Sequence, residues 1–424
     1  MKTFTQTKGP GFQFRISTLQ GFDVPVLVLL MVALPLLPLI YVALRWVVFA
    51  VLGLFALIIC IANVNQRDLT LNGPAILVFL FLFVAGFSTV FSSYQAEVWF
   101  GTAGYMTGFL SHIGFVALFL LAMKTASKQN GVVERVITLW LFSAGLIALI
   151  GLMQYFGLNL LPVGERGMFE PTTSYSTIFN TNDLGNYLAL AFPFAAHRFL
   201  LSFSKTSMLL LVLIYGATLT SLTRGAWLGI FVGGLVLFYL YPKKQYLVTL
   251  LITLLLVTGV LLPFNDWTLY HRVNTFSRET EKALEGDPEA GSSRFLLWQE
   301  GAKALPQSLL IGTGPDTFYY VSPDVFDEHF RSPRVPRKAH NLFLEYAVTI
   351  GIPGLLIFLL FIHSIVSKTN IRDPLHLTFL AMVIIHLVRG FFLVDVIQVY
   401  PLFWVLMGFY AGLTLKAKQG VTLA

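Results

Sequence analysis

The stretch that decides the architecture of this chain is residues 291–318, GSSRFLLWQEGAKALPQSLLIGTGPDTF, at the centre of its long hydrophilic segment. That segment runs from about residue 264 to 341, whereas the rest of the chain is apolar blocks joined by short connectors. Loops longer than about 12–15 residues are usually functional or disordered. An apolar stripe along one predicted helix is formed by Phe295, Leu297, Trp298, Ala302 and Leu305. An amphipathic helix of this kind predicts a folded cap and not a flexible linker.

The composition is that of a membrane protein. Apolar residues make up 56% of the 424 residues and charged residues 12%, whereas charged residues make up about 25% of soluble domains. The net charge of +7 does not indicate nucleic-acid binding, because the basic residues mostly lie in short connectors, where they set orientation in the membrane. The single cysteine, Cys60, lies in an apolar run, which excludes a disulfide framework and a thiolate metal cluster. The first 22 residues are polar, so we expect no cleavable signal peptide.

Twelve stretches are apolar and long enough to span a membrane, which takes about 20 residues. They are residues 23–41, 45–64, 74–92, 107–124, 136–156, 184–201, 207–222, 226–242, 246–263, 342–366, 376–394 and 400–416. We therefore predict an all-α polytopic protein of about 12 transmembrane helices. Nine helices lie in residues 1–263, an extracytoplasmic cap in 264–341, and three helices with a cytoplasmic tail in 342–424.

The orientation follows from the distribution of Lys and Arg in the connectors. An even number of spans places both termini on one side, and the connectors on that side carry most of the positive charge. This makes the termini cytoplasmic and the long segment extracytoplasmic.

Two arginines are candidates for binding an anion. Arg224 lies in SLTRGAWLG at the outer end of a helix hairpin, where a guanidinium is costly unless it is paired or lines a wet cavity. The alternative is an interfacial anchor whose charged end reaches water. Arg294 lies in SSRFLLWQ, and its alternative is an ordinary surface arginine. If both face one cavity, their forked groups suit phosphate oxygens.

Two further ionisable residues lie where the chain re-enters the membrane. His340 immediately precedes an apolar run, and an imidazole near neutrality is the standard general base. In that role its titration would make the rate rise with pH; the alternative is a structural histidine at the interface. Glu345 is either a functional carboxylate buried in the membrane or the partner of a neighbouring helix.

Polar residues within the apolar blocks complete the set of candidates. One cluster at the start of the sixth predicted helix comprises Asn180, Asn182, Asp183 and Asn186. Helix capping accounts for one of them, and four together suggest the wall of a cavity. One later span carries His386, Arg389 and Asp395, for which we expect an internal Arg–Asp pair. Gly312 and Gly314 indicate a tight turn and not a phosphate loop, and no ligand spacing predicts a metal site.

Three motifs in this order around a large outer loop resemble the O-antigen ligase/polymerase family. They are SLTRGAWLG, the stretch quoted above, and KAHNLFLEYAVTIGIPG, and the resemblance covers about residues 175–360. These are integral-membrane glycosyltransferases that use undecaprenyl-diphosphate-linked glycans, and the resemblance implies a GT-C-like helical fold. By motif, Arg224 and Arg294 match the two arginines thought to hold the donor diphosphate. His340 matches the histidine proposed to activate the acceptor hydroxyl.

The same resemblance extends to other residues. Asn180 and Asn182 correspond to the Gly-x-Asn-x-Asn stretch of the family, although the glycine expected before the pair is replaced here. We also expect Arg337, Lys338 and Glu345 to contact substrate.

The activity implied by the resemblance is transfer of a glycan from an undecaprenyl-diphosphate donor to an acceptor hydroxyl, on the outer face of a bacterial plasma membrane. The partners would be that donor, a lipid or glycan acceptor and membrane lipid, with no nucleic acid, metal or cofactor. Arginines would neutralise the leaving diphosphate. We favour ligation over polymerisation by the same family. A flippase or exporter of lipid-linked glycans is the alternative of another class.

Overall fold

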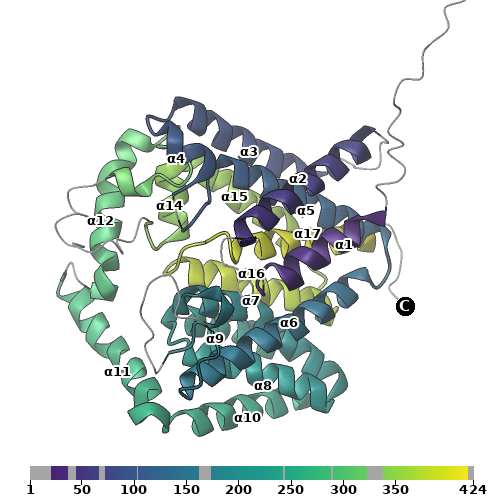
Figure 1. The fold of residues 1–424 in the computed structure, drawn as a ribbon, viewed down its shortest axis with the longest axis vertical. Helices are drawn as coiled ribbons and strands as arrows, with labels where there is room; N and C mark the ends of the chain where they lie inside the picture. The colour runs from purple at the N-terminus through teal and green to yellow at the C-terminus, as the bar shows by residue number, and fades with distance from the viewer. Residues whose placement is uncertain are drawn as a thin grey trace, which may run out of the picture.

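The computed structural model describes most of the chain, in eight ranges. These are residues 21–36, 44–65, 72–102, 104–161, 173–241, 244–287, 290–321 and 338–418. Within these ranges every regular element is a helix (Figure 1), which confirms the all-α fold. The backbone alone is described at residues 44–46, 62–65, 244, 283, 292, 293 and 418.

The helices follow one another along the chain with short connections. The first part contains α1 (Asp23–Val28), the π-helix η2 (Leu29–Ala33), α2 (Leu44–Asn65), α3 (Gly73–Phe91), α4 (Gln95–Phe100), α5 (Phe109–Lys128), α6 (Val132–Tyr155) and the 3-10 helix η4 (Ser176–Ile178). The middle part contains α7 (Thr181–Ser202), α8 (Lys205–Thr220), α9 (Arg224–Leu240), α10 (Lys244–Leu261), α11 (Phe264–Leu284) and α12 (Ala290–Ser308). The last part contains the 3-10 helix η5 (Phe318–Val321), α14 (Leu342–Thr349), α15 (Gly351–Val366), α16 (Pro374–Gly390) and α17 (Tyr400–Lys418).

Several of these helices have the length and composition of membrane spans. Among the described residues α3, α5 and α6 qualify, and a fourth span results if α10 and α11, bent by 116° between them, count as one. Six shorter apolar helices accompany them. The chain is therefore a membrane protein, while the number of twelve spans stays a prediction.

The centre of the bundle is α17, which lies along α5 (Figure 1). Two glycines allow this close approach. A Cβ atom on Gly408 would lie 2.4 Å from the carbonyl oxygen of Phe119, and one on Gly412 would lie 2.5 Å from that of Met123. Small residues permit such close backbone packing in membrane helices. This rigid pair places the segments that precede α5 and α17 beside the site described below.

The predicted span 342–366 is broken, contrary to the single helix expected from its composition. α14 ends at Thr349, and Gly351 adopts a left-handed backbone with φ +83°. The reason is a packing contact far along the chain: the turn at Gly312 and Gly314 lies against the end of α14, and the Gly314 N–H donates to the Thr349 carbonyl oxygen at 2.8 Å. The two turn glycines have φ +80° and +110°, which confirms the predicted tight turn.

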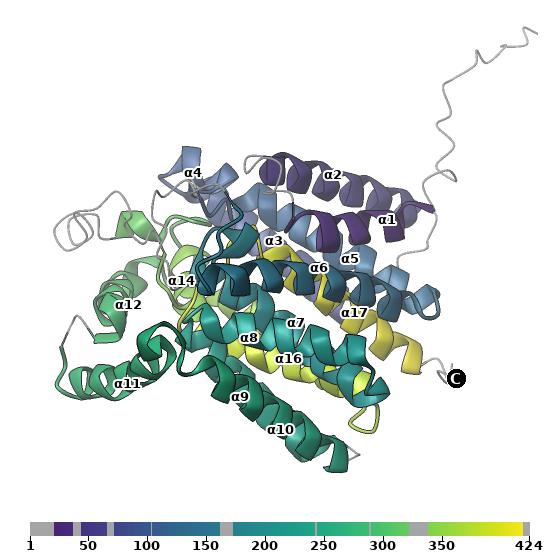
Figure 2. The same ribbon diagram turned by 60° about the horizontal axis from the view of Figure 1, so that its bottom comes forward.

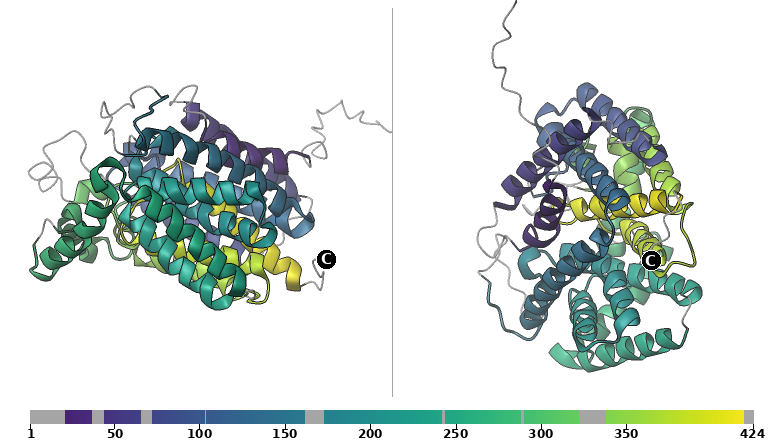
Figure 3. Two further views of the ribbon diagram at one scale, coloured as in Figure 1. Left: turned by 90° about the horizontal axis from the view of Figure 1, so that it is seen from below. Right: turned by 90° about the vertical axis from the view of Figure 1, so that its right-hand side faces the viewer.

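One end of the bundle carries the elements that shape the site. α4, α11, α12 and α14 gather there, while the C-terminal end of α17 lies at the opposite end (Figures 2 and 3). α11 turns away from α10 through three residues with left-handed backbone, Asn265, Asp266 and Trp267. α11 packs against α12, and α12 packs against α14.

Candidate functional site

A polar cavity, here called the asparagine cavity, brings together residues that are far apart in the sequence. Its polar lining consists of Tyr105, Asn180, Asn182, Asp183, Asn186, His340 and Gln398. Counting its open mouth, it encloses about 660 Å³. The four residues of the predicted polar cluster thus form a cavity wall, as expected, and His340 lies on the same cavity.

The start of α7 is held by the residue that precedes it. The Asn180 side chain accepts hydrogen bonds from the backbone N–H groups of Asn182 at 2.9 Å and Asp183 at 3.2 Å, which is the capping expected for one cluster member. The Thr223 hydroxyl donates to the Thr181 carbonyl oxygen at 3.0 Å. The beginnings of α7 and α9 therefore lie side by side, and Arg224 is the first residue of α9.

His340 is held in an unusual backbone conformation. Its φ is +48°, in the left-handed region that few residues other than glycine adopt. The next residue, Asn341, caps α14 by accepting hydrogen bonds from the N–H groups of Phe343 and Leu344, both at 3.0 Å. Among the described residues none supplies a hydrogen bond to His340 Nδ1, which is buried. Backbone strain of this kind clusters at functional sites.

The surroundings of His340 keep its imidazole neutral. Part of the residue remains exposed, but burial and then the positive charge of Arg294 lower the pKa of His340 to about 3. Both effects disfavour the protonated ring. At neutral pH the side chain is therefore in the form that can accept a proton.

Three arginines gather beside this histidine, and together we call them the arginine cluster: Arg224, Arg272 and Arg294. Arg224 Nη1 donates to the Thr275 hydroxyl on α11 at 3.1 Å, and its guanidinium carbon lies 5.5 Å from the centre of the Phe276 ring. Arg272 Nε donates to the Leu222 carbonyl oxygen at 3.1 Å. α9 and α11 are thereby joined through their arginines.

Arg294 on α12 experiences the charge of the other two. Burial, then Arg224 and Arg272, lower the pKa of Arg294 to about 10, whereas Glu279 acts in the opposite direction. Glu279 also holds the start of α12, because its Oε2 accepts the Gly291 N–H at 2.6 Å. Arg294 still carries its charge at neutral pH. The cluster is a concentration of positive charge whose natural complement is an anion.

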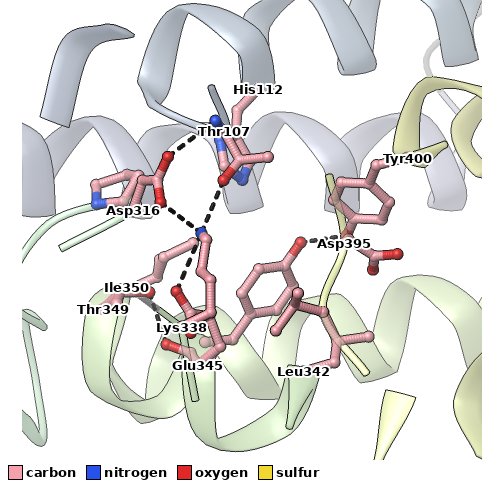
Figure 4. Close-up of a pocket in the computed structure, with 13 residues that line it drawn as sticks. Thr107, His112, Asp316, Lys338, Leu342, Glu345, Thr349, Ile350, Asp395 and Tyr400 are labelled. Carbon is pink, nitrogen blue, oxygen red and sulfur yellow. Dashed lines mark hydrogen bonds and ion pairs between the residues drawn. The ribbon is translucent and has the colours of Figure 1, made fainter. Parts of the chain in front are cut away.

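Lys338 and Glu345 form a separate charged group with Asp316, which we call the lysine triad. Lys338 Nζ lies 2.6 Å from Asp316 Oδ1 and 3.2 Å from Glu345 Oε1, and it donates to the Thr107 hydroxyl at 2.8 Å (Figure 4). Burial alone would lower the pKa of Lys338, but the two carboxylates outweigh it and raise that pKa. Because Lys338 and Glu345 have protein partners, nothing in this geometry supports the expected contact with substrate, which stays a prediction.

The remaining predicted residues are quickly placed. Arg337 lies outside the described residues. Arg389 Nη2 donates to Asp395 Oδ1 at 2.9 Å and to His386 Nδ1 at 2.6 Å, which confirms the internal Arg–Asp pair. Among the described residues no group of three or more His, Cys, Asp or Glu side chains is arranged to hold a metal ion.

Three site residues were missed by reasoning from the sequence. Arg272 resembles a surface arginine because it lies in an amphipathic stretch. Asp316 follows the predicted turn, and its pairing with Lys338 across 22 positions leaves no local pattern. Gln398 gave a signal, since it is an amide among Val, Ile and Tyr residues immediately before the last apolar block.

Comparison with known proteins gives one match. Residues 206–359 match the sequence model of a family described as O-antigen ligase. This range begins in α8 and ends in α15, and it includes the arginine cluster, the lysine triad and His340. No curated protein matches the chain.

Proposed function

Because the chain belongs to the O-antigen ligase/polymerase family of membrane enzymes, we propose that it transfers a glycan from a lipid diphosphate to an acceptor hydroxyl. One observation carries the proposal: a neutral histidine on a polar cavity lies within the electrostatic reach of the arginine cluster. A base and a cationic anion site are the two parts that this reaction needs.

In the proposed reaction each part has one task. His340 accepts the proton of the acceptor hydroxyl as the oxygen attacks the anomeric carbon of the donor sugar. The bond between that carbon and the diphosphate oxygen breaks, and the leaving lipid diphosphate keeps the electron pair. Arg224 and Arg294 neutralise the charge that develops on it, with forked groups that match phosphate oxygens.

The asparagine cavity is suited to the hydroxyl groups of a sugar acceptor. Asn186 and Gln398 are buried, and among the described residues Asn186 Oδ1 and Gln398 Oε1 have no hydrogen-bond donor. The other end of the Asn186 amide is already engaged, because its Nδ2 donates to the Val394 carbonyl oxygen at 3.3 Å. Buried amide oxygens are normally satisfied, and sugar hydroxyls are suitable donors. We therefore place the acceptor in this cavity.

The donor is undecaprenyl diphosphate carrying a glycan, and the reaction takes place on the outer face of the bacterial plasma membrane, with both termini in the cytoplasm. Ligation to a lipid or other acceptor is our first choice of activity, because the matched family carries the ligase description. Polymerisation differs only in that the acceptor is a second lipid-linked glycan.

The test uses purified full-length protein in liposomes with a labelled polyprenyl-diphosphate oligosaccharide, candidate lipid acceptors and a chelator. We expect release of polyprenyl diphosphate and formation of an acceptor-linked glycan. Lengthened donor-linked glycan without added acceptor would indicate the polymerase. Movement of labelled lipid across the bilayer with the diphosphate bond intact would indicate a transporter and contradict the proposal.

A further inference from the structure

We propose that the lysine triad is a positioning device for His340, and that Lys338, Asp316 and Glu345 act on the reaction through that histidine without touching substrate. The inference rests on the proposed function, because it takes His340 as the base. It assigns these three residues a role different from the substrate contact expected for Lys338 and Glu345 from the sequence.

The burial of the triad shows that it is an internal structure. The side chains of Lys338, Asp316 and Glu345 are 4%, 0% and 8% exposed. Removing charges from water costs several kcal/mol for each ion. Such a group persists where its geometry is closely fitted, and fixing one conformation is the role that buried ionic groups can serve. A substrate phosphate would have to displace contacts of 2.6–3.2 Å that already surround the ammonium.

Asp316 connects the triad to the segment that precedes α5. Its Oδ2 accepts the N–H groups of Thr102 at 2.9 Å and Thr107 at 3.0 Å, and its Oδ1 accepts the Thr102 hydroxyl at 3.1 Å. A Cβ atom on Gly101 would lie 2.5 Å from Asp316 Oδ2. The carboxylate is therefore enclosed by this segment on one side and by Lys338 on the other.

Glu345 connects the triad to the peptide group next to His340. Its Oε2 accepts the Ala339 N–H at 2.8 Å, and the Ala339 carbonyl oxygen accepts the Trp298 indole N–H at 3.1 Å. That carbonyl belongs to the peptide bond that joins Ala339 to His340. The backbone is thus held on both sides immediately before the left-handed residue.

The same triad also approaches the wall opposite His340. The Lys338 ammonium lies 5.6 Å from the centre of the Tyr105 ring, and Tyr105 lines the asparagine cavity. The Tyr105 carbonyl oxygen accepts the Ile397 N–H at 3.2 Å, next to Gln398 on that cavity. The triad consequently fixes the distance between His340 and the surface on which the acceptor would rest. A misplacement of about 1 Å costs on the order of 10²-fold in rate.

The experiment compares kcat and donor KM among variants of the full-length protein in liposomes. Glu345→Gln removes the charge and keeps an oxygen that can accept the Ala339 N–H, whereas Glu345→Ala removes both. Trp298→Phe removes only the N–H that holds the Ala339 carbonyl. We expect kcat to fall about 10²-fold for Glu345→Ala and about threefold to tenfold for Trp298→Phe. Glu345→Gln should keep most of the activity, and donor KM should be unchanged in all three.

A matched pair controls for the substitution itself. Lys338→Met should lower kcat, whereas Lys282→Met removes an exposed ammonium of the cap that lies 3.7 Å from Asp287 and should leave kcat unchanged. The folded fraction of each variant is measured by size-exclusion chromatography in detergent, and rates refer to folded protein.

Each contrary outcome points to a different error. If Glu345→Gln is as inactive as Glu345→Ala and donor KM rises, the carboxylate charge contacts substrate and the inference is wrong. Normal kcat in both Glu345→Ala and Trp298→Phe would also overturn it. If His340→Ala itself remains active, the proposed function fails, and that result is separate from the two others.

Discussion

The arginine cluster and the lysine triad both flank His340, but they balance their charges in opposite ways. In the triad one ammonium lies between two carboxylates, and backbone N–H groups bind both acids. In the arginine cluster three guanidinium groups share a small region, and Arg224 and Arg272 act unfavourably on Arg294. The triad is electrostatically complete without a ligand, whereas the arginine cluster accumulates like charge.

This difference separates residues that build the site from residues that bind. A completed charge group contributes geometry, because its partners are fixed when the chain folds. A concentration of like charge costs folding stability and is relieved by a bound anion, which is the usual trade-off between stability and function. The following predictions test this division.

The largest expected effect is loss of transfer when the arginine cluster is opened. Arg224→Ala and Arg294→Ala should each abolish activity while leaving folded protein in the membrane, because the diphosphate loses its charge partner. Lys at either position should rescue poorly, since a point charge cannot replace a bidentate fork. The readout is release of polyprenyl diphosphate. Near-normal activity of Arg294→Ala would remove this residue from the site.

The next effect is on stability and should differ in sign between the two groups. Lys338→Met leaves two buried carboxylates without their cation and should destabilise the protein by about 3–5 kcal/mol. Arg294→Met removes a cation that its neighbours repel, so its melting temperature should equal or exceed that of the wild type. Thermal unfolding in detergent measures both. A lower melting temperature for Arg294→Met than for Lys338→Met would reverse the division.

A smaller effect is expected where one hydrogen bond orients an arginine. Thr275→Val removes the hydroxyl that accepts Arg224 Nη1 at 3.1 Å and keeps the shape of the side chain. One such bond contributes about 1 kcal/mol, so we expect kcat/KM to fall roughly fivefold. Thr280→Val, on the same helix, removes a hydroxyl that donates within the helix to Phe276 and serves as the control. An equal loss in both variants would assign the effect to α11 as a whole.

The smallest expected change is in the pH profile near neutrality. From the sequence alone, the rate should rise as the histidine loses its proton. Burial and Arg294 move that pKa to about 3, so kcat/KM, which reports the free enzyme, should not rise with pH through 6–7. Arg294→Lys, used for residual activity, should leave the profile equally flat because the positive charge remains. A wild-type limb near pH 6.5 would place His340 in a more solvated state.

The same sign applies to folding stability. A histidine whose pKa is lower in the folded than in the unfolded state contributes stability that is present above the unfolded pKa and lost as pH falls. For His340 the loss runs from about pH 6.5 down to about 3. His340→Gln should therefore reduce acid sensitivity over that window.

Much of the fold could be predicted because it depends on local composition. Each predicted apolar stretch coincides with a helix or a pair of helices, since apolar runs and their polar ends are local properties. The Arg389–Asp395 pair was predictable because both residues lie near the end of one helix. The cluster at Asn180 was predictable because a cap needs one amide and the chain supplies more.

The parts that could not be predicted depend on contacts between distant segments. The break after Thr349 follows from the turn at Gly314, which packs against it from 35 positions away. The pairing of Lys338 with Asp316 crosses a long segment, so Lys338 resembled a free surface charge. The role of Arg272 depends on the bend between α10 and α11, which places it beside Leu222.

The central claim is that His340 is the base, and its most direct test is single-turnover kinetics of His340→Ala and His340→Gln with donor binding measured in parallel. Removing a general base lowers the rate by about 10²–10⁴-fold. We predict that loss in both variants with unchanged donor affinity, because glutamine keeps a polar side chain but cannot take the proton. If glutamine restored most of the activity, His340 would only orient its neighbours, and the acceptor would have to be activated by another group.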